Sequence, residues 1–150
     1  MLHLKKALFS ACESLVNGRI KSIEDAMRNA QSAANEETKS SAGDKYETGR
    51  AMMHLEKEKL AGQLSEAAKM KKALDLIDSD KLHSVAALGS VVRTAKASYY
   101  ISVSVGKLEV EGEVFFAISP ASPIGRQLLD KKQGESFSFA GRNQQIVTLA

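Results

Sequence analysis

Residues 20–34, IKSIEDAMRNAQSAA, decide the fold of the first half of this chain. Their apolar residues recur at alternating intervals of three and four, which is typical of the buried seam of a coiled coil. The same stripe extends toward the N-terminus through three more apolar residues. We therefore predict a long helix that buries a narrow seam against a partner helix. The seam positions are Leu8, Cys12, Val16, Ile20, Ile23, Met27, Ala30 and Ala34.

A second apolar stripe at near-heptad spacing follows, and one break separates the two stripes. The break is residues 40–44, SSAGD, in which Gly43 suits the end of a helix and Asp44 suits the start of the next one. The sequence therefore predicts an antiparallel helical hairpin, a coiled coil over residues 1–78 with its tip at residues 43–47. The second stripe consists of Tyr46, Met53, Leu60, Leu64, Ala67, Met70, Leu74 and Ile77.

The composition changes at about residue 78. Both prolines and six of the eight aromatic residues fall after it, and the apolar pattern changes to period two. We predict a small, mostly antiparallel sheet in residues 79–150, with one short helix at residues 122–129 that Ser122 caps and Pro123 opens. The fold class is α+β, with two domains, 1–78 and 79–150. The predicted strands are 90–94, 98–105, 113–119, 136–140 and 144–149, with turns at Gly106, Gly112, Gly134 and Gly141.

Charge and cysteine content exclude several classes of function. The 150 residues carry a net charge of +3 with no concentrated basic run, which argues against binding of free nucleic acid driven by counterion release. The single cysteine, Cys12, lies on the apolar seam and has no clustered histidines, so we expect neither a disulfide nor a zinc site. The sequence lacks long apolar runs and the pattern of a signal peptide, so we expect a cytoplasmic protein.

Residues 118–135, ISPASPIGRQLLDKKQGE, resemble the C-terminal signature of the Gre transcript-cleavage factors throughout their length. Residues 43–47, GDKYE, resemble the G-D-x-x-E tip of the coiled-coil arm in the same family. The two motifs occur in the family's order, and the resemblance of the arm and the C-terminal part together covers most of the chain. The resemblance implies an antiparallel coiled-coil arm followed by a C-terminal domain of the FKBP-like type.

The resemblance also implies a function. Gre-like proteins dock on RNA polymerase at the rim of its secondary channel and extend the arm toward the polymerase active centre. By resemblance, Asp44 and Glu47 are the tip carboxylates that share Mg²⁺ with the polymerase and stimulate hydrolysis of backtracked RNA. No enzymatic activity is expected of the chain alone, and no cofactor is expected to be bound to it alone. Mg²⁺ suits the proposal because it prefers hard oxygen ligands.

Each group of candidate residues has a structural alternative. Asp44 and Glu47 also fit a capping box at a helix start. The basic residues near the tip are candidates for contact with the nascent RNA 3′ end, although such residues usually form a solvated face. The docking candidates equally suit a helix start that is needed for folding. The RNA candidates are Lys39, Lys45 and Arg50, and the docking candidates are Ser119, Ser122, Pro123, Ile124, Gly125 and Arg126.

The tip departs from the family pattern, which leaves alternatives to cleavage. Tyr46 lies beside Glu47, and Thr48 and Gly49 follow where the family usually has an Asn-Ala-Glu-Tyr stretch. A non-catalytic protein that binds the same channel and modulates or inhibits the polymerase is therefore an alternative. An FKBP-like prolyl isomerase is a further one, although the chain lacks the tryptophan that floors the pocket of many such enzymes. The oligomeric state stays open, since a thin arm can also pair with another copy.

Overall fold

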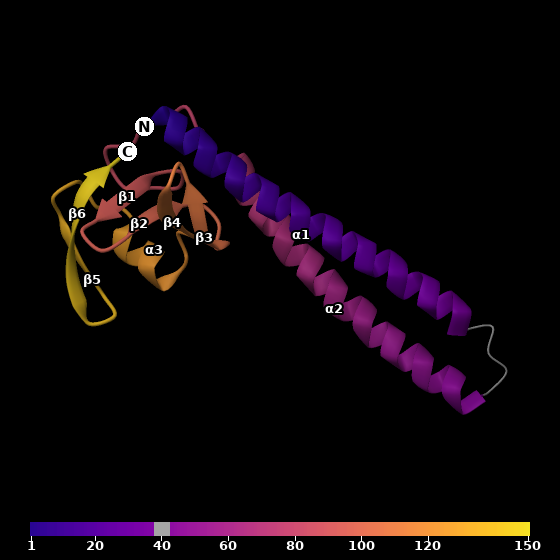
Figure 1. Ribbon diagram of the computed structural model, residues 1–150. Coiled ribbons are helices and arrows are strands. Elements are labelled where there is room, and N and C mark those ends of the chain that lie inside the picture. Colours follow the sequence, from indigo (N-terminus) through magenta and orange to yellow (C-terminus); the bar gives the residue numbers. More distant parts are fainter. Residues whose placement is uncertain (38–42) are drawn as a thin grey trace. The chain divides into compact units, whose positions relative to one another are not determined.

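The structure, a computed structural model, describes the backbone of residues 1–37 and 43–150 and the side chains of residues 1–36 and 47–150 (Figure 1). Two long helices precede a six-stranded sheet, and one short helix lies between its fourth and fifth strands in the chain. The predicted α+β class is therefore confirmed. The elements are α1 (Leu2–Glu37), α2 (Gly43–Asp75), β1 (Val91–Thr94), β2 (Ser98–Ile101), β3 (Gly106–Val110), β4 (Glu113–Ile118), α3 (Pro123–Leu128), β5 (Ser136–Phe139) and β6 (Arg142–Leu149).

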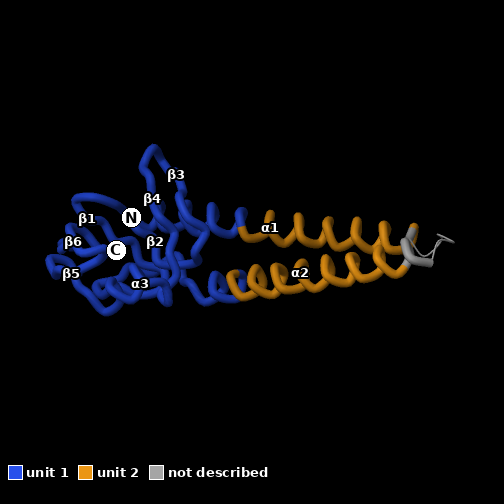
Figure 2. Tube along the Cα trace, turned by 90° about the horizontal axis from the view of Figure 1, so that it is seen from below, with its two compact units in different colours: residues 1–15, 71–150 blue, residues 16–70 orange. Residues whose placement is uncertain are grey.

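The contacts divide the chain into two compact units (Figure 2). The first unit, which we call the sheet unit, combines Met1–Leu15 with Lys71–Ala150, and the second, the arm unit, is Val16–Met70. Each long helix therefore contributes to both units. The compositional ranges 1–78 and 79–150 are a different division, and as domains they stay a prediction.

The arm unit is a helical hairpin. Figure 2 shows its two helices side by side, and Arg19 Nη1 contacts the Sδ atom of Met70 at 3.8 Å. Residues 19 and 70 are almost equally far along the chain from the middle of the predicted tip, as an antiparallel pairing requires. The predicted seam positions of the arm unit whose side chains are described are all buried or half-buried, in agreement with the prediction. Val16, Ala30, Leu60 and Ala67 are buried, and Ile20, Ile23, Met27, Ala34, Met53, Leu64 and Met70 are half-buried.

The sheet has the strand order β3-β4-β2-β1-β6-β5, and all neighbouring pairs are antiparallel except β2 with β4. The five predicted strands are present within a few residues, but the strand predicted to reach residue 105 ends at Ile101. Gly106, which we predicted as a turn, is the first residue of a sixth strand, β3. Only one side chain of β3, that of Leu108, is buried, so its apolar signal in the sequence is weak.

Two hairpins close through two-residue loops with positive φ. Glu111 and Gly112 join β3 to β4 with φ angles of 54° and 76°, and Ala140 and Gly141 join β5 to β6 with 53° and 74°. Two consecutive left-handed residues are the mark of a type I′ turn, which matches the twist of the strands that it joins. The two glycines therefore lie in turns, as we predicted.

Within the sheet unit, a helix packs on each face of the sheet. Alternation along β1 and β2 sends Val92 and Tyr99 to one face, where the buried side of α3 completes a core cluster. The opposite face receives the first turns of α1, because Cys12 Sγ lies 3.6 Å from Oγ of Ser102. Leu4 and Leu8 are buried on the same side of α1. The α3-side cluster consists of Ala86, Val92, Tyr99, Ile101, Ile124, Leu128, Phe137 and Ile146.

Candidate functional site

The tip of the arm is the first candidate site. α2 begins at Gly43, so Gly43 belongs to the second helix instead of ending the first, which corrects the predicted cap. Asp44 then lies in the first turn of α2, and Glu47 lies three residues further on, which places both positions on one side of the helix. The side chains of Glu47 and Arg50 are exposed to solvent.

The structure describes only part of this tip. Lys39 lies outside the described residues, and so do the side chains of Asp44 and Lys45, together with that of Tyr46. The first turn of a helix favours carboxylates because unpaired backbone N–H groups give it a partial positive charge. Among the described side chains, Glu47 therefore provides an exposed carboxylate close to the start of α2. Within the described part of the chain, no group of three or more His, Cys, Asp or Glu side chains is arranged to hold a metal ion.

The second candidate site is the segment between β4 and α3, residues 119–126. Ser122 is the N-cap of α3: its Oγ accepts a hydrogen bond from the backbone N–H of Gly125 at 3.1 Å and donates to the carbonyl of Ser119 at 2.7 Å. The Ser119 Oγ accepts in turn from the backbone N–H of Ser122 at 3.1 Å. Pro123 occupies the first helical position, where the missing N–H costs nothing. The predicted helix and its cap are confirmed.

Gly125 completes this segment because no side chain fits there. A Cβ atom at this position would lie 2.1 Å from the carbonyl oxygen of Ser119 and 2.9 Å from Oγ of Ser122. The helix start and the preceding turn thus approach each other closely. The two serines and the glycine of the signature therefore form one folded unit.

The docking candidates divide by exposure. Ile124 is buried in the core cluster, Gly125 is buried, and Ser119 and Ser122 are half-buried and hydrogen-bonded within the segment. Pro123 and Arg126 are exposed. Only Pro123 and Arg126 of these six residues are therefore accessible to a partner. The other four make contacts within the sheet unit.

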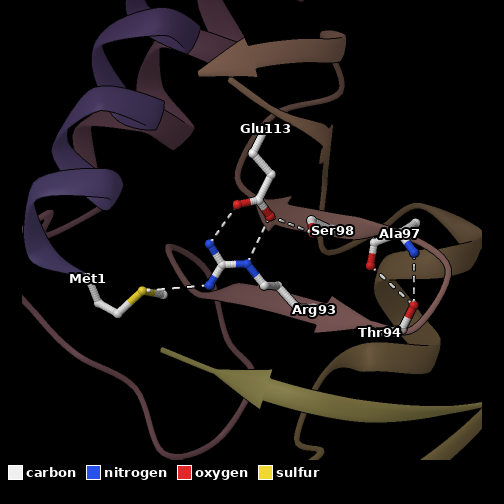
Figure 3. Close-up of polar contacts among 6 residues, drawn as sticks. All are labelled: Met1, Arg93, Thr94, Ala97, Ser98 and Glu113. Atoms are coloured by element: carbon white, nitrogen blue, oxygen red, sulfur yellow. Dashed lines mark hydrogen bonds and ion pairs between the residues drawn. The ribbon is translucent and has the colours of Figure 1, made fainter. Parts of the chain in front are cut away.

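Sequence reasoning missed a polar network at the sheet (Figure 3). Arg93 on β1 makes two hydrogen bonds to the carboxylate of Glu113 on β4, at 2.8 and 2.9 Å, and its guanidinium lies 5.7 Å from the ring centre of Phe115. Ser98 donates to the same carboxylate at 2.9 Å, and Met1 Sδ lies 3.7 Å from Arg93. The hydrogen bonds from Arg93 lower the pKa of Glu113 below its ordinary value.

The buried thiol of Cys12 has no feature of a reactive site. Burial raises its pKa, and the contact with Ser102 opposes that only in part. A thiol that resists ionisation is a poor nucleophile and a poor metal ligand. Cys12 is buried, as the sequence predicted, but it contacts Ser102 at the sheet, which corrects its predicted place in the seam between the two helices.

Comparisons with known proteins add little. No protein-family model matches the chain, and no curated protein matches it. Among solved structures, the chain is similar to the crystal structure of GreA factor homolog 1 (Gfh1) protein of Thermus thermophilus, with 18% sequence identity and a TM-score of 0.35. The match covers 91% of this chain and 93% of that chain. A TM-score this low does not assign a fold or a function, so the fold class is taken from the helices and strands of this chain.

Across residues 1–37 and 43–150, no helix is both long enough and apolar enough to cross a membrane.

Proposed function

We propose that this chain is a Gre-like regulator of transcription elongation that binds RNA polymerase at its secondary channel and stimulates cleavage of backtracked RNA. The observation that carries the proposal is the placement of the two Gre-like motifs. The tip motif falls at the start of the second hairpin helix, and the 118–135 motif forms the strand end and capped helix of the sheet unit. In the Gre-like proteins that the motifs resemble, the first motif lies at the tip of the arm and the second lies in the domain that binds the polymerase.

The chemistry of the tip suits this role. Positions 44 and 47 supply carboxylate oxygens, the ligand type that Mg²⁺ prefers, and two such groups complete a site only when a partner provides the other ligands. Mg²⁺ held in this shared way lowers the pKa of a bound water and so supplies a nucleophile for hydrolysis of a phosphodiester. Asp44 and Glu47 would hold the ion and orient the water. The chain alone is therefore expected to have no activity.

Basic residues near the tip fit the same proposal. Arg50 is exposed and follows Glu47 by three residues, so both lie on one side of α2. A guanidinium there can contact the phosphates of an RNA 3′ end. Lys39 and Lys45 are proposed for the same role on the resemblance and the sequence alone.

A cleavage assay tests the proposal. Stalled, backtracked elongation complexes are incubated with Mg²⁺ and the intact chain, and shortening of the RNA is followed over time. We expect faster cleavage with the parent chain, and loss of most of the stimulation with Asp44→Asn and with Glu47→Gln. Glu58→Gln is the matched control, because Glu58 is another exposed carboxylate on α2 away from the tip. Equal stimulation by the parent and the tip variants contradicts the catalytic form of the proposal.

A non-catalytic channel-binding protein is the second candidate. It is favoured by the tip sequence, where Tyr46, Thr48 and Gly49 replace the residues usual in the family. A competition assay against an authentic Gre factor separates the two functions. Displacement of that factor without stimulation of cleavage supports the channel-binding protein, and stimulation of cleavage supports the first proposal.

A further inference from the structure

Lys5 is a lysine without exposed surface. It lies in the second turn of α1, and its ammonium donates a hydrogen bond to the backbone carbonyl of Lys81 and lies 2.9 Å from Nδ1 of His83. Both partners belong to the segment that connects α2 to β1, and all three residues lie in the sheet unit. Lysines are rarely buried completely unless their charge is partnered. The contact therefore joins the start of α1 to that segment.

The chemistry of the contact fixes the state of the histidine. An ammonium has three donors and no acceptor, so Nδ1 of His83 must accept the hydrogen bond. The imidazole can accept there only when it is neutral and carries its hydrogen on Nε2. Protonation of His83 removes this acceptor and places a second positive charge against Lys5.

The surroundings favour the neutral imidazole. Burial is the largest cause that lowers the pKa of His83, and the charges of Lys5 and Lys81 lower it further, while Asp78 opposes them. Burial also lowers the pKa of Lys5 to about 8, again opposed by Asp78. His83 Cε1 would lie 3.5 Å from a Cβ built on Gly89, so the ring lies against the turn that precedes β1.

We propose that Lys5 and His83 form an acid-sensitive clasp that holds the start of α1 to residues 78–89, closed while His83 is neutral and released when His83 is protonated. The clasp needs no polymerase and is independent of the proposed function.

The direction of the pH effect follows from the lowered pKa of His83. The folded chain binds this proton less readily than the unfolded chain, whose histidine has an ordinary pKa of about 6.5. The stabilisation by the clasp is therefore complete above about pH 6.5 and falls as the pH decreases. The lowered pKa of Lys5 also makes the fold more stable as the pH rises. This second effect falls in the alkaline range, between about 8 and the ordinary pKa of lysine.

Two ion pairs also involve residues next to the clasp in the sequence. His3 Nε2 lies 2.6 Å from the Glu111 carboxylate, and Lys6 Nζ lies 2.8 Å from Asp80. Both pairs are largely exposed, so solvent screens them and they contribute little.

Nuclear magnetic resonance of the His83 ring in the intact chain tests the proposal directly. At about pH 7.5 we expect an unprotonated Nδ1, and in the titration we expect a midpoint below the ordinary value of about 6.5. Lys5→Met removes one of the charges that lower the pKa, so it should raise the midpoint. A hydrogen on Nδ1 at neutral pH, or an identical midpoint in the parent and in Lys5→Met, overturns the clasp.

Amide hydrogen exchange provides the second measurement. Asn Oδ1 takes the place of His Nδ1 as an acceptor that does not titrate, so His83→Asn should keep the clasp closed in mild acid. We expect the exchange rate of residues 78–89 in the parent, relative to His83→Asn at the same pH, to rise several-fold as the pH falls from about 7.5 to about 5.5. His3→Asn is the control and should leave this rise unchanged. A ratio that stays constant with pH overturns the proposal, and if His83→Asn does not fold, the parent's tautomer and the shift in Lys5→Met decide it.

Discussion

Position 125 has no room for a side chain, because a Cβ there would lie 2.1 Å from a backbone oxygen. Gly125→Ala therefore requires a shift of the turn or of the helix start. We expect the free energy of unfolding to fall by about 1–3 kcal/mol, as at other overpacked sites. Urea denaturation followed by circular dichroism measures it, and an unchanged midpoint would contradict the close approach.

Gly18 is the matched control for this substitution. It lies inside α1, and an added Cβ would meet nothing within 4 Å. Gly18→Ala should stabilise the chain by roughly 0.5–1 kcal/mol, because alanine loses less backbone freedom in a helix. A destabilising Gly18→Ala would show that this position needs the flexibility of glycine.

The Arg93–Glu113 pair predicts a pH dependence. Because the pKa of Glu113 is lowered in the folded chain, the pair stabilises the fold above the ordinary carboxyl value and loses that effect as the pH falls through the lower folded value. Glu113→Gln should cost roughly 1 kcal/mol near neutral pH, a modest value because the pair is partly exposed. Urea denaturation of parent and variant across the acidic range checks it, and a difference independent of pH would contradict the assigned role of the charge.

Local and long-range polar contacts differ in how far sequence could predict them. The Ser122 cap and Pro123 were predictable because the partners lie within three residues of one another. The contact of Lys5 with His83 spans 78 residues and that of Arg93 with Glu113 spans 20, and no local pattern marks either. Such contacts depend on which elements the fold brings together.

At the scale of elements, the arm is held by a thin seam. Leu60 is buried in it, whereas Leu55 on the same helix is 64% exposed. Leu60→Ala should destabilise the arm unit by roughly 2–3 kcal/mol, and Leu55→Ala should have almost no effect. Thermal unfolding followed by helical circular dichroism compares the two variants. Equal losses would contradict the assigned seam.

Elements whose apolar residues recur at regular intervals were predictable from the sequence. The strand β3, which has no such regular pattern, was not predicted. The seam shows in the sequence because apolar residues recur at every third or fourth position along the first helix and at near-heptad spacing along the second. The strand β3, in contrast, alternates charged residues with a single buried leucine and begins at Gly106. Its place at the edge of the sheet follows from pairing with β4, which local sequence does not encode. The same holds for the parallel pairing of β2 with β4.

At the scale of the whole molecule, the proposed function gives the two units different roles. Arg126 is an exposed docking candidate in the sheet unit, and Glu47 is an exposed tip carboxylate in the arm unit. We expect Arg126→Glu to weaken polymerase binding and Glu47→Gln to leave binding intact while reducing RNA cleavage. Binding and cleavage assays on both variants test this separation. A Glu47→Gln variant that loses binding as strongly as Arg126→Glu would contradict it.

Binding to RNA polymerase tests the central claim most directly. The intact chain, labelled away from both candidate sites, is titrated with core polymerase from the same organism, and an authentic Gre factor is then added as competitor. We predict saturable binding with a Kd in the micromolar range or tighter, and displacement of the chain by the competitor. Absence of saturable binding, or binding that the competitor does not reduce, would contradict the account.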